Sequence, residues 1–106
     1  MKKKAVMFLL AFCLMSHSAT AWTVRGAGGA SCGRVTGDAE EHEAFFTSWI
    51  LGFFSGLNLL TESNTSSDVD VRAIWAAVEK YCAENPLDDM KDGALDVYLR
   101  LKDMNK

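Results

Sequence analysis

The sequence is poor in histidine, cysteine and proline, and these scarcities limit the chemistry that the chain can carry. Its 106 residues include two histidines, three cysteines and one proline. A zinc site built from cysteine and histidine pairs lacks its second pair, and the Cys-x-x-Cys motif of redox proteins does not occur. The length fits one small domain and excludes a multidomain enzyme.

Apolar residues are abundant by contrast. They make up 49% of the chain, and charged residues make up 24%. These shares are typical of a protein that folds around a packed core, and they exclude a disordered or collagen-like chain. No alternating strand pattern, internal repeat or low-complexity segment is found, so helical periodicity is the main structural signal.

The first 21 residues have the pattern of a secretory signal peptide. Lysines occupy positions 2–4, an apolar run covers 5–15, and small residues at 19–21 suit a cleavage site. The run is shorter than the roughly 20 residues that a membrane-spanning helix needs. We therefore expect residues 1–21 to be removed, and the mature chain to begin at Trp22 in the periplasm.

Removal of this leader makes the protein acidic. Three lysines are lost, which leaves eight basic and fourteen acidic side chains and a formal charge of −6. Nucleic acids and anionic membrane surfaces attract clustered lysine and arginine, so neither is expected as a partner.

The leader also contains one of the three cysteines, and the mature chain keeps Cys32 and Cys82. Two cysteines in an exported protein are the ordinary setting for a structural disulfide. Closing a loop of about 50 residues would stabilise the fold by roughly 4 kcal/mol. We predict that the two cysteines are paired.

The mature chain is predicted to be an all-α domain of three to four helices. Residues 22–37 contain five glycines and predict an irregular arm, which the disulfide would join to the end of the second helix. Residues 38–106 form the helical domain, and its first helix covers 38 to about 60, with Asp38 as its N-cap.

Two further helices follow in the sequence. Ser67 is predicted to cap the second helix in a capping box with Asp70, and this helix carries a clear apolar stripe as far as Cys82. Asn85 is predicted to cap the third helix, with Pro86 at its first position, and Leu87 begins an apolar stripe that continues to about residue 102.

The first helix also allows a membrane interpretation. Residues 44–61 are 18 residues without a charge, which is near the lower limit for a spanning segment. Thr47, Ser48, Ser55 and Asn58 make the stretch polar, and we favour a helix that does not span. Gly52 and Gly56 form a small-x-x-x-small pair, which permits close approach of another helix or is simply tolerated.

Few groups are available for catalysis. His42 is the one histidine of the mature chain, and no cysteine is free once the disulfide forms. Neighbours along a helix point about 100° apart, so a run of adjacent residues does not make a helical metal site. We interpret two acidic groups as solvated faces: Glu40, Glu41 and Glu43, and Asp88, Asp89 and Asp92. The prediction is a non-enzyme with no catalytic residue, cofactor or metal.

Surplus apolar surface points instead to protein binding. A domain of 85 residues cannot readily hide so many large rings, and each one buried contributes roughly 1.5 to 3 kcal/mol. A homodimer, protein clients or a single protein partner would cover the excess. The candidate binding or dimer surface comprises Phe46, Trp49, Phe53, Phe54, Leu57 and Trp75.

Several segments of the chain carry a family resemblance. These are Cys32 before the first helix, Trp49-Ile50-Leu51-Gly52-Phe53 within it, Asp68 and Asp70 after it, and Tyr81-Cys82-Ala83-Glu84-Asn85-Pro86. With them the sequence resembles the HdeA-type periplasmic acid-stress chaperones over about residues 31 to 102. The resemblance implies a small helical domain with one disulfide, dimeric at neutral pH, which exposes apolar surface in acid and holds unfolding client proteins.

The segment from Tyr81-Cys82 to Tyr98-Leu99 carries a second resemblance. It is similar to that of the small periplasmic immunity proteins that neutralise type VI secretion amidase effectors, which are also exported, helical, disulfide-bonded and often dimeric. The immunity function is the alternative to the chaperone function. A membrane-embedded regulator that spans at 44–61 is the third.

Overall fold

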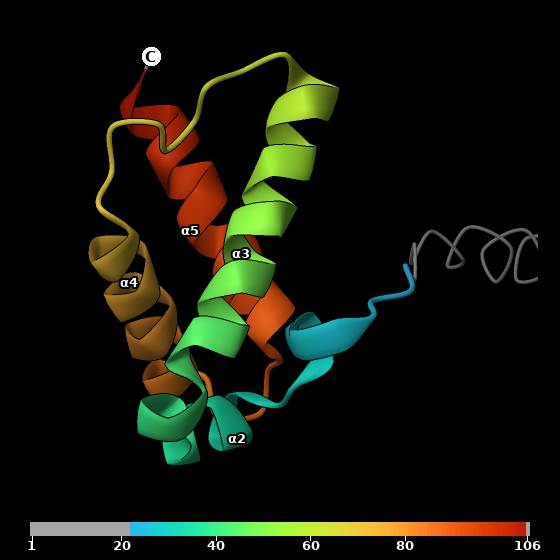
Figure 1. Cartoon of the computed structure of the whole chain (residues 1–106), viewed down its shortest axis with the longest axis vertical. Coiled ribbons are helices and arrows are strands. Elements are labelled where there is room, and N and C mark those ends of the chain that lie inside the picture. Colours follow the sequence, from blue (N-terminus) through green and yellow to red (C-terminus); the bar gives the residue numbers. More distant parts are fainter. Residues whose placement is uncertain (1–21, 106) are drawn as a thin grey trace, which may run out of the picture.

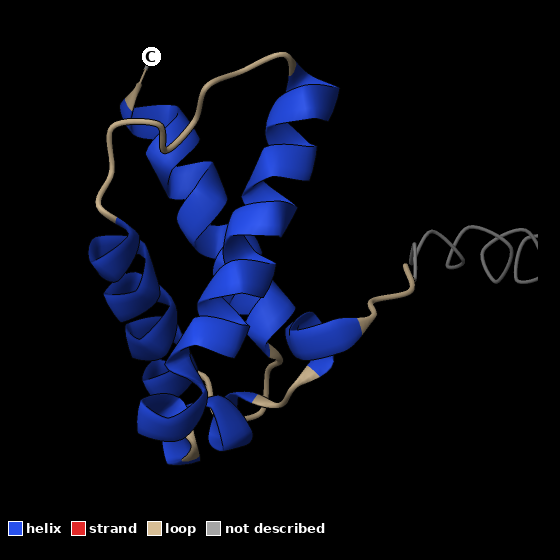
Figure 2. Cartoon of the chain, viewed as in Figure 1, coloured by secondary structure: helices blue, strands red, loops and turns tan. Residues whose placement is uncertain are grey.

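The computed structural model describes residues 22–105, so the signal peptide predicted for residues 1–21 lies outside the described residues. A 3-10 turn, η1 (Gly26–Gly29), is followed by α2 (Cys32–Gly37), α3 (Ala39–Thr61), α4 (Val71–Glu84) and α5 (Met90–Met104). Over this part of the chain every regular element is helical (Figure 2). The predicted all-α class is confirmed.

Three long helices make the body of the molecule. α3 and α4 approach each other at the end where α2 lies and separate toward the 62–70 connection, with α5 behind them (Figure 1). The N-terminal arm, residues 22–31, leaves the body beside α3. One side of α3 therefore faces the core, another side faces the arm, and a third side faces solvent.

Aromatic rings join α3 to its two neighbours in the core. Phe46 stacks on Trp75 of α4 with ring centroids 5.9 Å apart, and Phe54 meets Tyr98 of α5 edge-on at 5.3 Å. All four rings are buried. Such pairs contribute about 0.5 to 1.5 kcal/mol each beyond the burial of their area.

The predicted irregular arm, 22–37, is partly helical. Residues 32–37 form α2, because the Ser31 side chain accepts a hydrogen bond from the backbone N–H of Arg34 at 3.2 Å and so caps the first turn. Arg34 then lies 3.5 Å from Asp38 in an i,i+4 ion pair.

The first long helix has the predicted extent but not the predicted cap. α3 begins at Ala39, and the Asp38 side chain makes no capping hydrogen bond. The helix also bends at His42, whose φ of −122° and ψ of 17° are not helical. The part of α3 that packs along the core begins after His42.

The predicted start of the second helix is three residues too early. Asp70, not Ser67, is the N-cap of α4, and its carboxylate accepts from the N–H of Arg72 at 2.7 Å. The backbone N–H of Ser67 donates to Asn64 instead, within a turn in which Ser66 has a positive φ of 72°. The residues that the sequence predicts to begin the second helix therefore belong to this turn.

The third helix begins at Met90 rather than at Pro86. The N–H of Cys32 donates to the carbonyl of Asp88 at 2.8 Å, and the N–H of Met90 donates to the carbonyl of Ala30 at 2.9 Å. The chain turns over residues 85–88, where the N–H of Asp88 donates to the carbonyl of Asn85 at 3.1 Å, and Asp89 is extended in the bridge to the arm. Leu87, predicted to begin the apolar stripe, is consequently 98% exposed.

Candidate functional site

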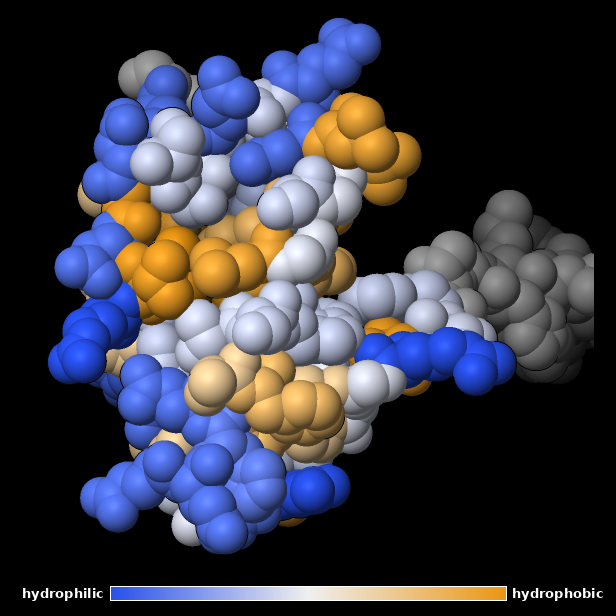
Figure 3. Space-filling model, viewed as in Figure 1, coloured by the Kyte–Doolittle hydropathy of each residue, from blue (hydrophilic) through white to orange (hydrophobic). Residues whose placement is uncertain are grey.

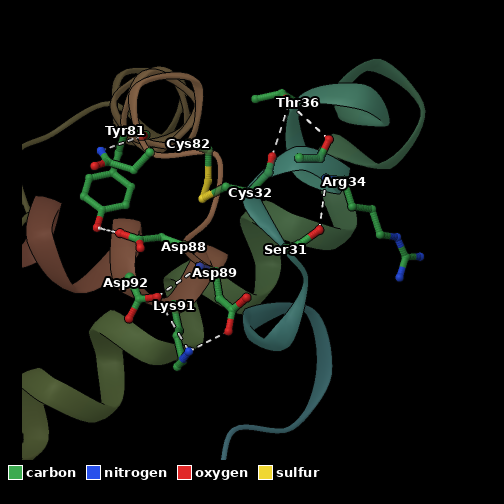
Figure 4. The surroundings of a disulfide bond; sticks show 12 residues. Ser31, Cys32, Arg34, Thr36, Tyr81, Cys82, Asp88, Asp89, Lys91 and Asp92 are labelled. Carbon is green, nitrogen blue, oxygen red and sulfur yellow. Dashed lines mark hydrogen bonds and ion pairs between the residues drawn. A yellow bond between two sulfur atoms is a disulfide. The ribbon is translucent and has the colours of Figure 1, made fainter.

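The disulfide lies where the arm, α2, α4 and the start of α5 meet (Figure 4). Cys32 and Cys82 are both buried, their Cα atoms are 4.6 Å apart, and 50 positions separate them in sequence. The predicted pairing is confirmed. Together with the Ser31–Asp89 bridge, it fixes the arm to the far end of α4.

Tyr81 makes the main polar contact beside this junction. Its hydroxyl donates to a carboxylate oxygen of Asp88, and its ring lies against Gly93, where a Cβ would be 2.8 Å from the ring. The hydrogen bond to Asp88, with a smaller contribution from burial, raises the pKa of Tyr81 to about 12. The hydroxyl therefore keeps its proton and serves as a structural donor.

The neighbouring aspartates begin α5. Asp89 and Asp92 form a reciprocal capping box, and Lys91 Nζ lies 2.8 Å from Asp89 Oδ2 and 3.6 Å from Asp92 Oδ2. The hydrogen bond to Asp89 is the largest contribution raising the pKa of Lys91. These aspartates were interpreted as a solvated face; the structure gives each a bonding partner. Within residues 22–105, no group of three or more acidic, histidine or cysteine side chains could hold a metal ion.

A second polar cluster holds the end of α3. The Tyr98 hydroxyl donates to Asn58 Oδ1 at 2.9 Å, and Asn58 Nδ2 donates to the carbonyl of Thr65 at 3.1 Å. Burial raises the pKa of Tyr98, but hydrogen bonds from Ser63, Thr61 and Thr65 outweigh it and lower the pKa below its ordinary value. The cluster ties the 62–70 connection to α5 and fixes the direction of the last turn of α3.

The arm covers one flank of α3. Trp49 donates its indole N–H to the carbonyl of Arg25 at 2.9 Å and stacks on Phe53 with centroids 5.1 Å apart. Trp22 stacks on the same Phe53 at 5.9 Å. Gly28 lies so close to the indole that a Cβ there would be 2.1 Å from it. The arm thus removes this aromatic pair from open surface.

The predicted binding surface is consequently largely interior. Its members Phe46, Phe54 and Trp75 are core residues, while Trp49, Phe53 and Leu57 are partly buried against the core. The correction has a simple cause: α3 is apolar nearly all round, so its pattern does not show which side meets the core and which meets the arm.

Three of the exposed large apolar side chains lie on the outer side of α3, and the others are scattered over the arm, α4, α5 and the turn before α5. Phe45, Leu59 and Leu60 are 55%, 78% and 81% exposed. Figure 3 shows a hydrophobic patch at the C-terminal end of α3 and a paler surface along its middle. We call this surface the outer face of α3; it comprises seven exposed residues, Phe45, Ser48, Gly52, Ser55, Gly56, Leu59 and Leu60.

α3 is also the one helix within residues 22–105 that is long and apolar enough to cross a membrane. Only 17% of its most apolar stretch is buried inside the protein. Four further apolar residues of α3 are partly buried against the core: Trp49, Leu51, Phe53 and Leu57.

Comparison with protein-family models, with curated proteins and with solved structures finds no match to this chain. Its own architecture defines its class, a small all-α domain with one disulfide and an uncovered apolar helix face.

Proposed function

We propose that the mature chain is an exported, non-enzymatic protein-binding domain that holds unfolding client proteins under acid stress, as HdeA-type chaperones do. The observation that carries the proposal is the outer face of α3, where large apolar side chains are exposed in a domain that has already filled its core. Such a face favours partners that present apolar segments.

The exposed side chains suit weak and general binding. Covering a leucine or phenylalanine side chain contributes roughly 1.5 to 3 kcal/mol, and the attraction depends on area rather than on direction. A client whose core has opened offers many such segments, so no shaped pocket is needed. Phe45 at one end of the face and Leu59 and Leu60 at the other allow an extended segment to contact both.

The charge of the mature chain suits the same role in acid. Near pH 2 its carboxylates are largely neutral, and about ten positive charges remain on basic side chains, His42 and the N-terminus. Client proteins are also positively charged at that pH. Complexes that repel one another stay dispersed, because net charge opposes association.

Light scattering of an acid-labile client at pH 2 to 3 tests the proposal. The mature protein is expected to suppress aggregation, and the double variant Leu59→Ser/Leu60→Ser is expected to lose most of this effect. Leu87→Ser is the matched control, because Leu87 is 98% exposed but lies outside α3. Aggregation unchanged by the wild-type protein would end the chaperone proposal. Binding confined to one secreted amidase would favour the immunity function.

Membrane association is the third candidate function, after the immunity function, because α3 has the length and composition of a spanning helix. It requires α3 to leave the core contacts of Phe46, Ile50 and Phe54. The mature protein would then fractionate with membranes and resist alkaline extraction. Recovery in the soluble periplasmic fraction would exclude it.

A further inference from the structure

The connection between α3 and α4 contains a sequence motif that the proposed function does not use. In Glu62-Ser63-Asn64-Thr65-Ser66, a hydroxyl residue lies two positions after an asparagine, and a carboxylate lies two positions before it. Asn-x-Ser/Thr without proline at x is the acceptor motif for N-linked glycans. The form with the additional carboxylate is the one that bacterial oligosaccharyltransferases recognise on exported proteins. Neither Asn58 nor Asn85 is followed by a hydroxyl residue at the same distance.

The side chains of this motif alternate between the interior and the surface. The Ser63 hydroxyl is hydrogen-bonded within the polar cluster that holds the end of α3, and Thr65 is 4% exposed. Glu62 and Asn64 are exposed, and Ser66 is half-exposed. The two positions that a glycosylating enzyme does not read are therefore the two that anchor the connection, and the three positions that it reads are accessible.

The backbone around Asn64 is irregular and lies at one end of the molecule. Residues 62–70 form no regular element, and φ is positive at both Glu62 and Ser66, with values of 50° and 72°. The connection lies at the end opposite α2 (Figure 1). Within residues 22–105 the Asn64 side chain makes no hydrogen bond, so the fold does not occupy its amide. Irregular segments of this kind are where enzymes that modify folded proteins gain access to the chain.

We propose that Asn64 of the folded, exported protein is a site of N-linked glycosylation. The Asn64 amide nitrogen attacks C1 of the first sugar of an oligosaccharide carried on a polyprenyl diphosphate. The bond from nitrogen to C1 forms, and the bond from C1 to the diphosphate oxygen breaks. The amide nitrogen loses one proton, and the polyprenyl diphosphate leaves with the bonding electrons.

Glu62 and Ser66 act in this reaction as recognition groups. The Glu62 carboxylate offers a charge for pairing with a cationic side chain of the enzyme, and the Ser66 hydroxyl offers a hydrogen bond. Neither residue belongs to the outer face of α3. The proposal therefore depends on export of the chain but not on its binding of clients.

Glycan transfer with purified components is the first test. The mature, disulfide-bonded protein is incubated with a bacterial oligosaccharyltransferase that requires the acidic motif and with a lipid-linked oligosaccharide of known mass. Intact-mass spectrometry should show one added glycan on the wild-type protein and none on Asn64→Gln. Glu62→Gln should slow the transfer about tenfold, because a charge-assisted contact is lost.

Asp68→Asn is the matched control, because it removes the same charge from an exposed position of the same connection, outside the motif. It should be modified at the wild-type rate. Transfer to the reduced, unfolded protein but not to the folded one would overturn the proposal, and so would equal rates for the wild-type protein and Glu62→Gln.

The protein purified from the periplasm of the cells that make it provides the second test. Its peptide that contains Asn64 should carry the mass of a glycan, and a peptide found entirely unmodified would overturn the proposal. Neither measurement uses a client, so a glycosylated protein without chaperone activity and a chaperone without a glycan are distinguishable results.

Discussion

At the residue scale, Gly28 of the arm lies against the Trp49 indole and leaves no room for a Cβ. Gly28→Ala places a methyl group where the ring lies, so we expect a loss of about 1 to 3 kcal/mol in the free energy of unfolding. Urea denaturation measures it. Gly33→Ala in α2, where a Cβ meets nothing within 4 Å of the described chain, should be neutral or stabilising. Equal effects of both variants would contradict this account of the arm.

The hydroxyl of Tyr81 gives a second residue-scale prediction, on alkaline pH. Its pKa is about 12 in the folded protein and near 10 when unfolded, so the hydrogen bond to Asp88 contributes fully below pH 10. This contribution is lost as pH rises from about 10 to 12. Tyr81→Phe should therefore lower the free energy of unfolding by about 1 kcal/mol at pH 8 and flatten its alkaline decline. An unchanged pH profile would show that the bond is not made in solution.

The carboxylate of Glu79 should destabilise the folded protein at neutral pH. A carboxylate that stabilises the fold has the opposite effect on the free energy of unfolding. Burial, and then the charge of Glu43, raises its pKa above the ordinary value. Its contribution to stability is present below the unfolded pKa and is lost as pH rises through the folded pKa. Glu79→Gln should therefore be more stable than wild type at pH 7, and the difference should vanish near pH 3. Thermal unfolding at both pH values measures it, and a variant less stable at pH 7 would contradict the sign.

At the element scale, the disulfide is the tie whose removal should matter most. It closes a loop of 50 positions between Cys32 and Cys82. Replacing both cysteines by alanine should lower the free energy of unfolding by roughly 4 kcal/mol, because the unfolded chain regains the freedom of that loop. Denaturant titration of the variant against the oxidised wild-type protein measures the loss. A change below about 1 kcal/mol would mean that the bridge and core hold the arm without it.

Helix existence could be predicted from the sequence, and helix starts could not. Apolar periodicity placed all three long helices because each buries one stripe in the core. The starts of α4 and α5 were wrong because local caps compete with distant contacts. Ser67 and Asn85 are both plausible N-caps, but Ser67 belongs to the turn at Ser66 and Asn85 caps the end of α4, where its backbone N–H and its side chain both donate to the carbonyl of Tyr81.

The exposed side of α3 was harder to predict than the helix itself. The apolar richness of α3 was visible in sequence, yet its aromatic residues divide among the core, the arm and the outside. Phe46 is buried against Trp75, its neighbour Phe45 is exposed, and Trp49 is held by Arg25 of the arm. The signal that could have found the outer face is the 4-3 spacing of Phe45, Ser48, Gly52, Ser55 and Leu59.

At the scale of the whole molecule, the covalent and apolar features have separate tasks. The disulfide and the stacked rings hold the arm against one flank of α3, and α4 and α5 cover another. The outer face of α3 stays uncovered, as do separate apolar side chains such as Leu87 and Met104, on a protein that becomes strongly cationic in acid. The proposed chaperone function uses the outer face of α3.

Photo-cross-linking during acid stress tests the central claim most directly, because it reports where a client touches the protein. A photoreactive phenylalanine analogue is placed at Leu59 on the outer face or at Leu87, which is equally open but lies outside α3. At pH 2 to 3, in the presence of an unfolding client, the account predicts abundant client adducts from position 59 and few from position 87. Adducts of equal yield from both positions, or from neither, would contradict it.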